Sequence, residues 1–299
     1  MNKSEWENRL NQWRQPLSET EEKRCANAER MVKEALKADT ELAKRNIEIF
    51  LQGSYRNNTN VRTESDIDIC VRLMDVFFTH LPPNSSNETF GLTDAVGPKY
   101  ADYKQEVINA LVAKFGEKNV EVGKKAVVVI ENSYRIHADV VICYEHRRYR
   151  ENGGYYSGVE FRSTLGDKII NFPLHHIENG TTKNVATGHQ YKRIARILKT
   201  LNIEMDGVSG YKRLPSFFIE CLAWNVPNET LINHSTYYDA VRASLQFLHA
   251  NLTDESKYSE WGEVSELLYL FRGHSKWTAQ DGVKFAESAW EYAEFTKND

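Results

Sequence analysis

The stretch LQGSYRNNTNVRTESDIDICVRL, residues 51–73, opens on a Gly-Ser pair and closes on a run of apolar β-formers that contains two aspartates. The final part alternates with a period of two, which is typical of a β-strand. Successive side chains of a strand point to opposite faces. One face therefore carries Ile67, Ile69, Val71 and Leu73, and the other carries Asp66, Asp68, Cys70 and Arg72. The acids and the apolar residues do not compete, so a polar site can be built onto a core strand.

A third aspartate, Asp139, interrupts another β-rich run, RIHADVVICYEH. Carboxylates at positions i and i+2 of a strand lie about 6–7 Å apart and repel unless a cation neutralises them. If the two strands are neighbours, Asp66, Asp68 and Asp139 converge, which suits two Mg²⁺ ions in phosphoryl transfer, with Mn²⁺ as a possible substitute. The alternative is a solvated face of an edge strand. Two nearby acids, Glu64 and Glu131, are interpreted as surface residues.

The Gly-Ser pair precedes this strand and has its own chemistry. Gly53 lets the backbone approach a ligand closely. The amide and hydroxyl of Ser54 are donors for phosphate oxygens. Gly-Ser occurs by chance in most chains, but together with the D-x-D strand and a further strand aspartate it is a specific pattern.

The pattern along the chain predicts an α+β, bilobed protein. Residues 1–160 are expected to form a catalytic lobe with an N-terminal helix and a mixed sheet, and residues 161–299 an α-helical lobe, with the active site in the cleft between them. A helix is predicted over residues 18–50, with SETE as a capping box, and another near 100–115. After Gly153-Gly154 the pattern is helical, with helices expected near 189–201, 215–224, 237–252, 261–271 and 279–295.

Composition excludes several classes of protein. The chain has 299 residues, is 41% hydrophobic and 27% charged, and carries a net charge of −4, which argues against a general nucleic-acid-binding surface. Its four scattered cysteines form no C-x-x-C pair, so a zinc site is not expected, and Cys70 and Cys143 read as buried thiols. With no signal peptide and no apolar run of about 18 residues, the expected location is the cytoplasm, without membrane contact.

These motifs resemble the G-S…D-x-D signature of the DNA polymerase β-like nucleotidyltransferase superfamily. The form QGSYRNNTNVRTESDID is most similar to the cGAS/DncV-like nucleotidyltransferases (CD-NTases), which make cyclic oligonucleotide second messengers. The resemblance covers residues 52–68, the strand around Asp139, and residues 183–211. It implies that Asp66, Asp68 and Asp139 hold the catalytic metals. It also implies that Gln52, Gly53 and Ser54 belong to the nucleotide site.

The resemblance extends to the helical half. It implies that Lys192 contacts the donor triphosphate, that Tyr211 stacks on a nucleobase, and that Ser209 contacts the base or phosphates. The alternative for Tyr211 is a partly buried core residue. Arg196 and Lys199 lie opposite an apolar helical stripe, where a cationic face is usually solvated.

The implied activity is condensation of NTPs into a cyclic di- or trinucleotide with loss of pyrophosphate. ATP and GTP are the expected substrates, and pyrimidine nucleotides are possible. The zinc-binding insertion of the animal DNA sensors is missing from the sequence. A bacterial member is therefore implied, without a DNA activator, acting with an effector that binds the product in defence against phage. The alternatives are a transferase that modifies an antibiotic, a protein or an RNA 3′ end, and an inactive nucleotide-binding module.

Overall fold

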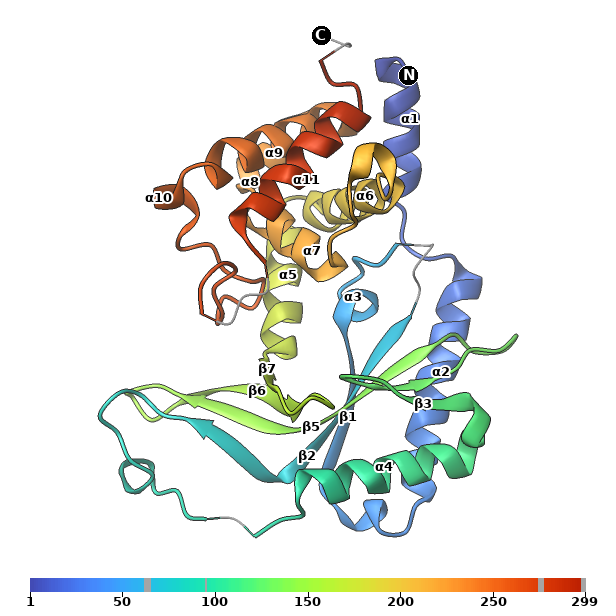
Figure 1. Ribbon diagram of the computed structural model, residues 1–299, viewed down its shortest axis with the longest axis vertical. Coiled ribbons are helices and arrows are strands. Elements are labelled where there is room, and N and C mark those ends of the chain that lie inside the picture. The colour runs from blue at the N-terminus through green and yellow to red at the C-terminus, as the bar shows by residue number, and fades with distance from the viewer. Residues whose placement is uncertain (62–65, 95, 274–276, 297–299) are drawn as a thin grey trace. The chain divides into compact units, whose positions relative to one another are not determined.

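The computed structural model describes residues 1–61, 66–94, 96–273 and 277–296 (Figure 1). The chain forms two compact units. The sheet unit comprises Ser18–Arg56 and Glu64–Leu174, and the helical unit comprises Met1–Leu17, Asn57–Thr63 and His175–Asp299. A mixed sheet in one unit and helices in the other confirm the predicted α+β class. Glu64 lies outside the described residues.

The sheet unit is built on a sheet with strand order β1-β2-β5-β4-β3, in which β6 pairs with β5 and with β7. The strands are β1 (Ile47–Gln52), β2 (Ile67–His80), β3 (Val120–Val122), β4 (Val127–Val129), β5 (Ala138–Tyr149), β6 (Tyr155–Arg162) and β7 (Lys168–Asn171). The β2–β5 pair is parallel, and the other pairs are antiparallel. The two long strands β2 and β5 therefore form the centre of the unit (Figure 1).

The apolar face of β2 lies in the core, as its period predicts. Ile67, Ile69, Val71 and Leu73 are all fully buried. Two helices accompany the sheet, α2 (Glu19–Ala38) and α4 (Tyr100–Phe115), and the Tyr103 hydroxyl of α4 donates to the carbonyl of Val71 at 3.3 Å. The capping box predicted at Ser18 is present at the start of α2. The opposite face of the sheet has a smaller apolar cluster that includes the buried thiols of Cys70 and Cys143.

The helical unit has one apolar core shared by helices far apart in the sequence. Most buried residues of this core come from α1 (Lys3–Trp13), α6 (Gln190–Glu204), α7 (Ser216–Asn225), α8 (Asn228–Ile232), α9 (Tyr237–Leu252) and α11 (Ala279–Tyr292), and Tyr258 of α10 (Glu255–Tyr258) packs against them. Helix α5 (Pro173–Ala186) leads into this unit. Among the described residues, none of the helices is long and apolar enough to cross a membrane.

Several predicted elements were wrong. The helix predicted over 18–50 ends at Ala38, and its last part is β1. Residues 155–171, predicted to begin the helical pattern, form β6 and β7. Residues 261–271 are not a helix; they contain turns, bends and an isolated bridge between Gly262 and Tyr269.

The two units also differ from the predicted division at residue 160. The first residues of the chain, including α1, and the segment after the Gly-Ser turn belong to the helical unit, which resumes at His175. Trp6 and Leu10 of α1 are buried in the core of the helical unit. The N-terminal helix therefore stabilises the helical unit and is not part of the sheet unit.

Replacing Leu10 by Ala should therefore destabilise the protein. Deleting a fully buried leucine side chain costs about 2–5 kcal/mol of unfolding free energy, because a cavity remains. Gln12→Ala on the same helix is the control, since Gln12 is exposed. Denaturant titration should separate the two variants. Equal unfolding free energies would show that α1 does not pack as described.

Candidate active site

The strand register brings two of the predicted catalytic aspartates to neighbouring positions. Asp68 of β2 pairs with Asp139 of β5 in the parallel ladder. Residues in register on parallel strands project from the same face of the sheet. On the other side of β2, Gln52 of β1 pairs with Asp68. Asp66 comes immediately before β2 and is exposed.

The electrostatic environment of Asp139 shows that the carboxylates are close enough to interact. Burial raises the pKa of Asp139 above its ordinary value, and the charge of Asp66 raises it further, whereas His137 lowers it. Folding thus disfavours the ionised form of Asp139. A cation at this position would remove the repulsion between the carboxylates.

Gly53 forms the other wall of the site. It begins the short helix α3 (Gly53–Arg56), which also carries the half-buried Ser54. Gly53 has a φ of +68°, and a Cβ added there would lie 1.9 Å from Oδ2 of Asp68. Only glycine fits this backbone conformation and this approach to a carboxylate. The Gly-Ser turn and the D-x-D strand, separated in the sequence, are therefore directly adjacent in space.

The chemistry of these donors fits a divalent metal. Mg²⁺ prefers carboxylate oxygens, and the raised pKa of Asp139 indicates that a compensating positive charge is favourable there. In the part of the chain that the structure describes, no three His, Cys, Asp or Glu side chains are already gathered as an ion site. Metal binding by Asp66, Asp68 and Asp139 therefore stays a prediction.

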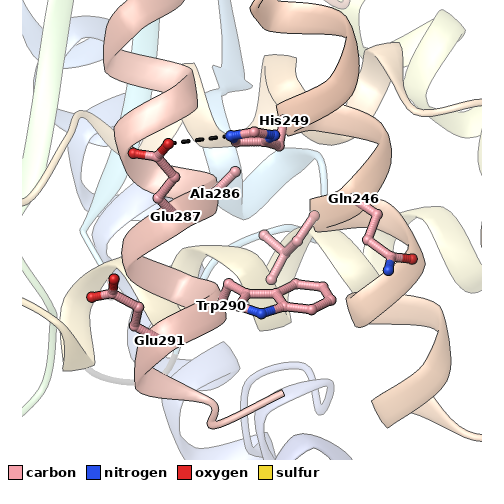
Figure 2. A pocket seen from close by; sticks show the side chains of 7 residues that line it. Gln246, His249, Ala286, Glu287, Trp290 and Glu291 are labelled. Atoms are coloured by element: carbon pink, nitrogen blue, oxygen red, sulfur yellow. Dashed lines mark hydrogen bonds and ion pairs between the residues drawn. The ribbon is translucent and has the colours of Figure 1, made fainter. Parts of the chain in front are cut away.

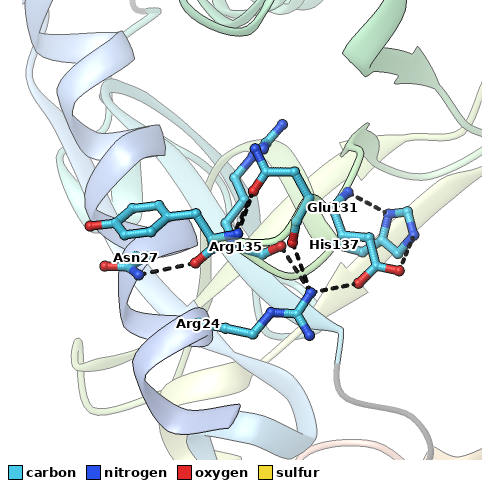
Figure 3. A network of polar contacts seen from close by, with 7 residues as sticks. Arg24, Asn27, Glu131, Arg135 and His137 are labelled. Carbon is cyan, nitrogen blue, oxygen red and sulfur yellow. Dashed lines mark hydrogen bonds and ion pairs between the residues drawn. The ribbon is translucent and has the colours of Figure 1, made fainter. Parts of the chain in front are cut away.

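A polar network holds the loop that leads into Asp139 (Figure 3). Arg24 of α2 donates to Glu131 Oε2 at 2.9 Å and to the carbonyls of Asn132 and Arg135 at 3.0 and 3.2 Å. The carbonyl of His137 accepts from the amide of Ile67 at 3.1 Å, at the start of β2. This role of Arg24 was not predicted, because nothing in the sequence links a helical arginine to a distant loop. Glu131 is exposed, as predicted.

Two predicted nucleotide contacts lie in accessible parts of the helical unit. Lys192 is half-buried in the first turn of α6, where its Nζ lies 3.5 Å from Thr181 Oγ1. Ser209 is exposed in the turn Val208–Gly210 and has a φ of 48°, in the left-handed region. Their roles toward a nucleotide stay predictions.

Tyr211 has the contacts of a core tyrosine, the alternative that the sequence left open. Its side chain is only 4% exposed and belongs to the core of the helical unit. Its hydroxyl donates to Asn202 Oδ1 at 2.6 Å, and burial raises its pKa above the ordinary value. A ring buried in this way has too little open face for a nucleobase, so the structure does not support a stacking role.

Two further cations of α6, for which a solvated face was one of the alternatives, are buried. Arg196 donates to the carbonyl oxygens of Arg14 and Asn58, and Lys199 donates to Glu220 of α7. A solvated role for Arg196 and Lys199 is therefore wrong. Glu220 was not predicted as a buried acid, although it interrupts the apolar run SFFIECLAWN in the same way as Asp139 interrupts its own run.

A surface pocket lies between α9 and α11 of the helical unit (Figure 2). Trp290 forms part of the lining of this pocket, and at its edge His249 Nε2 lies 3.2 Å from Glu287 Oε1. No residue of the predicted site lines this pocket.

Gly53→Ala should disrupt the site for two reasons, backbone strain and a clash with Asp68. A non-glycine residue at positive φ costs about 1–2 kcal/mol. The added Cβ would in addition displace the Asp68 carboxylate. We expect the variant to lose Mg²⁺-dependent binding of a nucleoside triphosphate, measured by calorimetry.

Gly91→Ala is the matched control, because Gly91 has a similar φ of +63° but nothing within 4 Å of the added Cβ. This control should lose stability and keep its binding. Equal binding by the two variants would contradict the role of Gly53 beside Asp68.

Comparison with known proteins supports the assignment of both units. Residues 178–294 match the cGAS/DncV-like nucleotidyltransferase C-terminal helical domain, and residues 29–152 match the nucleotidyltransferase domain. The solved structure of the Rhodothermus marinus CdnE c-UMP-AMP synthase has a TM-score of 0.79 at 28% identity, and the match covers 96% of each chain.

Two similar proteins match nearly end to end. The chain is 44% identical to a cyclic dipyrimidine nucleotide synthase, CdnE, of Cecembia lonarensis, over 97% of this chain and 98% of the relative. It is 36% identical to a cyclic dipurine nucleotide synthase of Elizabethkingia meningoseptica, over 96% and 97% respectively. Identity of this degree over the full length, together with the paired aspartates of β2 and β5, places the chain in the cGAS/DncV-like nucleotidyltransferase family.

Proposed function

We propose that this protein condenses nucleoside triphosphates into a cyclic dinucleotide and releases pyrophosphate. The observation that carries the proposal is the parallel register of Asp68 and Asp139, with Gly53 in contact with Asp68. This geometry supports the proposal, because the Gly-Ser turn, which would bind the phosphates, lies directly beside paired carboxylates, and nucleotidyl transfer requires both. The full-length similarity to cyclic nucleotide synthases supports the same reaction.

Each residue of the sheet unit has a distinct part in this proposal. Asp66 and Asp68 would hold one Mg²⁺ and, with Asp139, a second, with Mn²⁺ as a substitute. Bound ions would neutralise the triphosphate and activate the attacking ribose hydroxyl. The backbone at Gly53 and the Ser54 hydroxyl would orient the triphosphate, so that the α-phosphate lies in line with that hydroxyl. Gln52, opposite Asp68, would contribute to this nucleotide site.

The helical unit would supply the remaining contacts. Lys192, at the start of α6, is the proposed cation for the donor triphosphate, since an ammonium group is a compact charge for phosphate oxygens. The exposed Ser209 is a proposed polar contact to the base or phosphates. The buried Tyr211 would support the backbone beside Ser209 and not stack on the base.

We propose pyrimidine nucleotides as substrates ahead of ATP and GTP, which the sequence had favoured. The support is the 44% identity to a cyclic dipyrimidine nucleotide synthase, compared with 36% to a dipurine synthase. We place the reaction in the cytoplasm of a bacterium, where the product would bind an effector in defence against phage, without a DNA activator. The buried free thiols of Cys25, Cys70, Cys143 and Cys221 suit a reducing compartment.

Incubation with all four NTPs and Mg²⁺ or Mn²⁺, followed by phosphatase treatment and mass spectrometry, tests this function. We expect a phosphatase-resistant cyclic dinucleotide that contains uracil or cytosine, and one pyrophosphate released per bond formed. A purely purine product would overturn the proposed base choice. Transfer only onto an added third molecule, or binding without pyrophosphate release, would overturn the condensation itself.

Asp139→Asn should abolish turnover and leave the fold intact. The folded state raises the pKa of Asp139, so this carboxyl group favours folding at low pH. That contribution is lost as the pH rises from the pKa of this group in the unfolded chain through its raised pKa in the folded protein. At pH 7 without metal, the neutral amide should therefore give an unfolding temperature at or above that of the wild type.

Glu121→Gln is the control for this variant, because Glu121 is an exposed carboxylate on the edge strand β3. It should keep wild-type turnover in the same pyrophosphate-release assay. Near-wild-type turnover by Asp139→Asn would remove Asp139 from the catalytic site.

A further inference from the structure

The segment that joins the Gly-Ser turn to the catalytic strand has an unusual environment. Residues 57–61, called the strap below, follow α3 directly and precede Asp66. These residues belong to the helical unit, although α3 and Asp66 belong to the sheet unit. Loops normally run over the surface. In the strap, by contrast, Asn57, Thr59, Asn60 and Val61 are buried, and only Asn58 is exposed.

Thr59 is tied to an ionic network inside the helical unit. Its hydroxyl donates to Glu220 Oε2 at 2.6 Å and accepts from Lys199 Nζ at 3.1 Å. Glu220 also receives an ion pair from Lys199 and a hydrogen bond from His176 Nε2 at 2.8 Å. Thr59 is 0% exposed, Lys199 1% and Glu220 3%. The network thus joins α5, α6 and α7 to the strap through one hydroxyl group.

The charges of this network are balanced without Thr59. Burial by itself would raise the pKa of Glu220, but Lys199 and His176 hold it well below its usual range. The carboxylate is therefore ionised and paired with Lys199 whether or not Thr59 is present. The Thr59 hydroxyl adds a directional link from this ion pair to the strap.

A second contact fixes the strap one residue earlier. Nη1 of Arg196 in α6 donates to the carbonyl oxygen of Asn58 and, at 3.3 Å, to its side-chain Oδ1. Nε of the same arginine donates to the carbonyl oxygen of Arg14 at 2.7 Å. Asn58 has a φ of 52°, in the left-handed region. The guanidinium of Arg196 thus holds the strap at its one exposed residue, next to Thr59.

We propose that Thr59, Lys199, Glu220 and Arg196 are positioning residues, which fix the strap and through it the Gly53-Ser54 turn relative to Asp66. This inference rests on the proposed nucleotidyl transfer. Phosphoryl transfer depends on the in-line placement of its groups, and a misplacement of about 1 Å can cost roughly 100-fold in rate. Loosening the strap should therefore lower kcat at least tenfold and change KM for the NTP by less than about threefold.

Thr59→Val is the variant that isolates this link. It keeps the shape of the side chain and the Lys199–Glu220–His176 pairs but removes the hydroxyl. The matched control is Ser244→Ala in α9, which removes an equally buried hydroxyl that donates to the Ala240 carbonyl at 2.7 Å. Both variants should lower the unfolding temperature by a few degrees. Only Thr59→Val should lower kcat.

Hydrogen exchange provides a readout that does not depend on turnover. Amides of residues 57–61 should exchange faster in Thr59→Val than in the wild type and Ser244→Ala. Thr59→Ser, which restores the hydroxyl, should recover both the kcat and the slow exchange. If Thr59→Val does not fold, Arg196→Lys, which shortens the side chain and loses its forked donor, should give the same loss of kcat.

Two different failures can be told apart. If the wild type condenses no NTPs, the proposed function fails. If the wild type is active and Thr59→Val has the kcat and exchange pattern of Ser244→Ala, the network only stabilises the helical unit and the inference is overturned. A rise in KM alone would also overturn it, because that result would indicate a direct substrate contact.

Discussion

The parallel pairing of β2 with β5 is the constraint on which the candidate site depends. It brings Asp68 and Asp139 to neighbouring positions on one face of the sheet. The position of Asp139 has an electrostatic cost, because burial and then the charge of Asp66 raise its pKa above the ordinary value. On the opposite face, Ile67, Ile69, Val71 and Leu73 are fully buried, which stabilises this part of β2 independently of the site. A one-residue slip of register would turn the acids into the core, so packing of the apolar face also fixes the position of the carboxylates.

The features that the sequence predicted best depend on local periodicity. The alternation in residues 66–73 gave the correct faces of β2, and the capping signal at Ser18 marks a helix start in the structure. The family resemblance also led to the correct class of fold. Whether Asp68 and Asp139 are neighbours could not be read from either strand alone, because strand order depends on contacts distant in the sequence.

The errors share one physical cause, which is that tertiary packing overrides local pattern. The sequence IEIFLQ follows a helix without a strong stop signal, and it becomes β1 because it pairs with β2. Arg196 and Lys199 follow the spacing of a polar face of α6, but neighbouring segments of the helical unit cover that part of the helix and bury both side chains. Tyr211 matched a family position, yet its hydroxyl has a buried partner in Asn202. The type of a residue and its spacing along the chain therefore do not determine whether its side chain is buried.

The network around Glu220 is better explained as a device that positions the strap than as a source of stability for the helical unit. Replacing a buried ion pair with apolar residues of similar volume is often neutral or stabilising, so burial of Lys199 and Glu220 is weak evidence that the fold needs their charge. An apolar core would offer Thr59 no polar partner, whereas the paired charges bind its hydroxyl in one direction and at one distance. A loop held in this way has fewer positions open to it. Asp66 lies immediately before the strand that follows and Asp68 lies within it. For nucleotidyl transfer the placement of those groups matters more than additional stability in the helical unit.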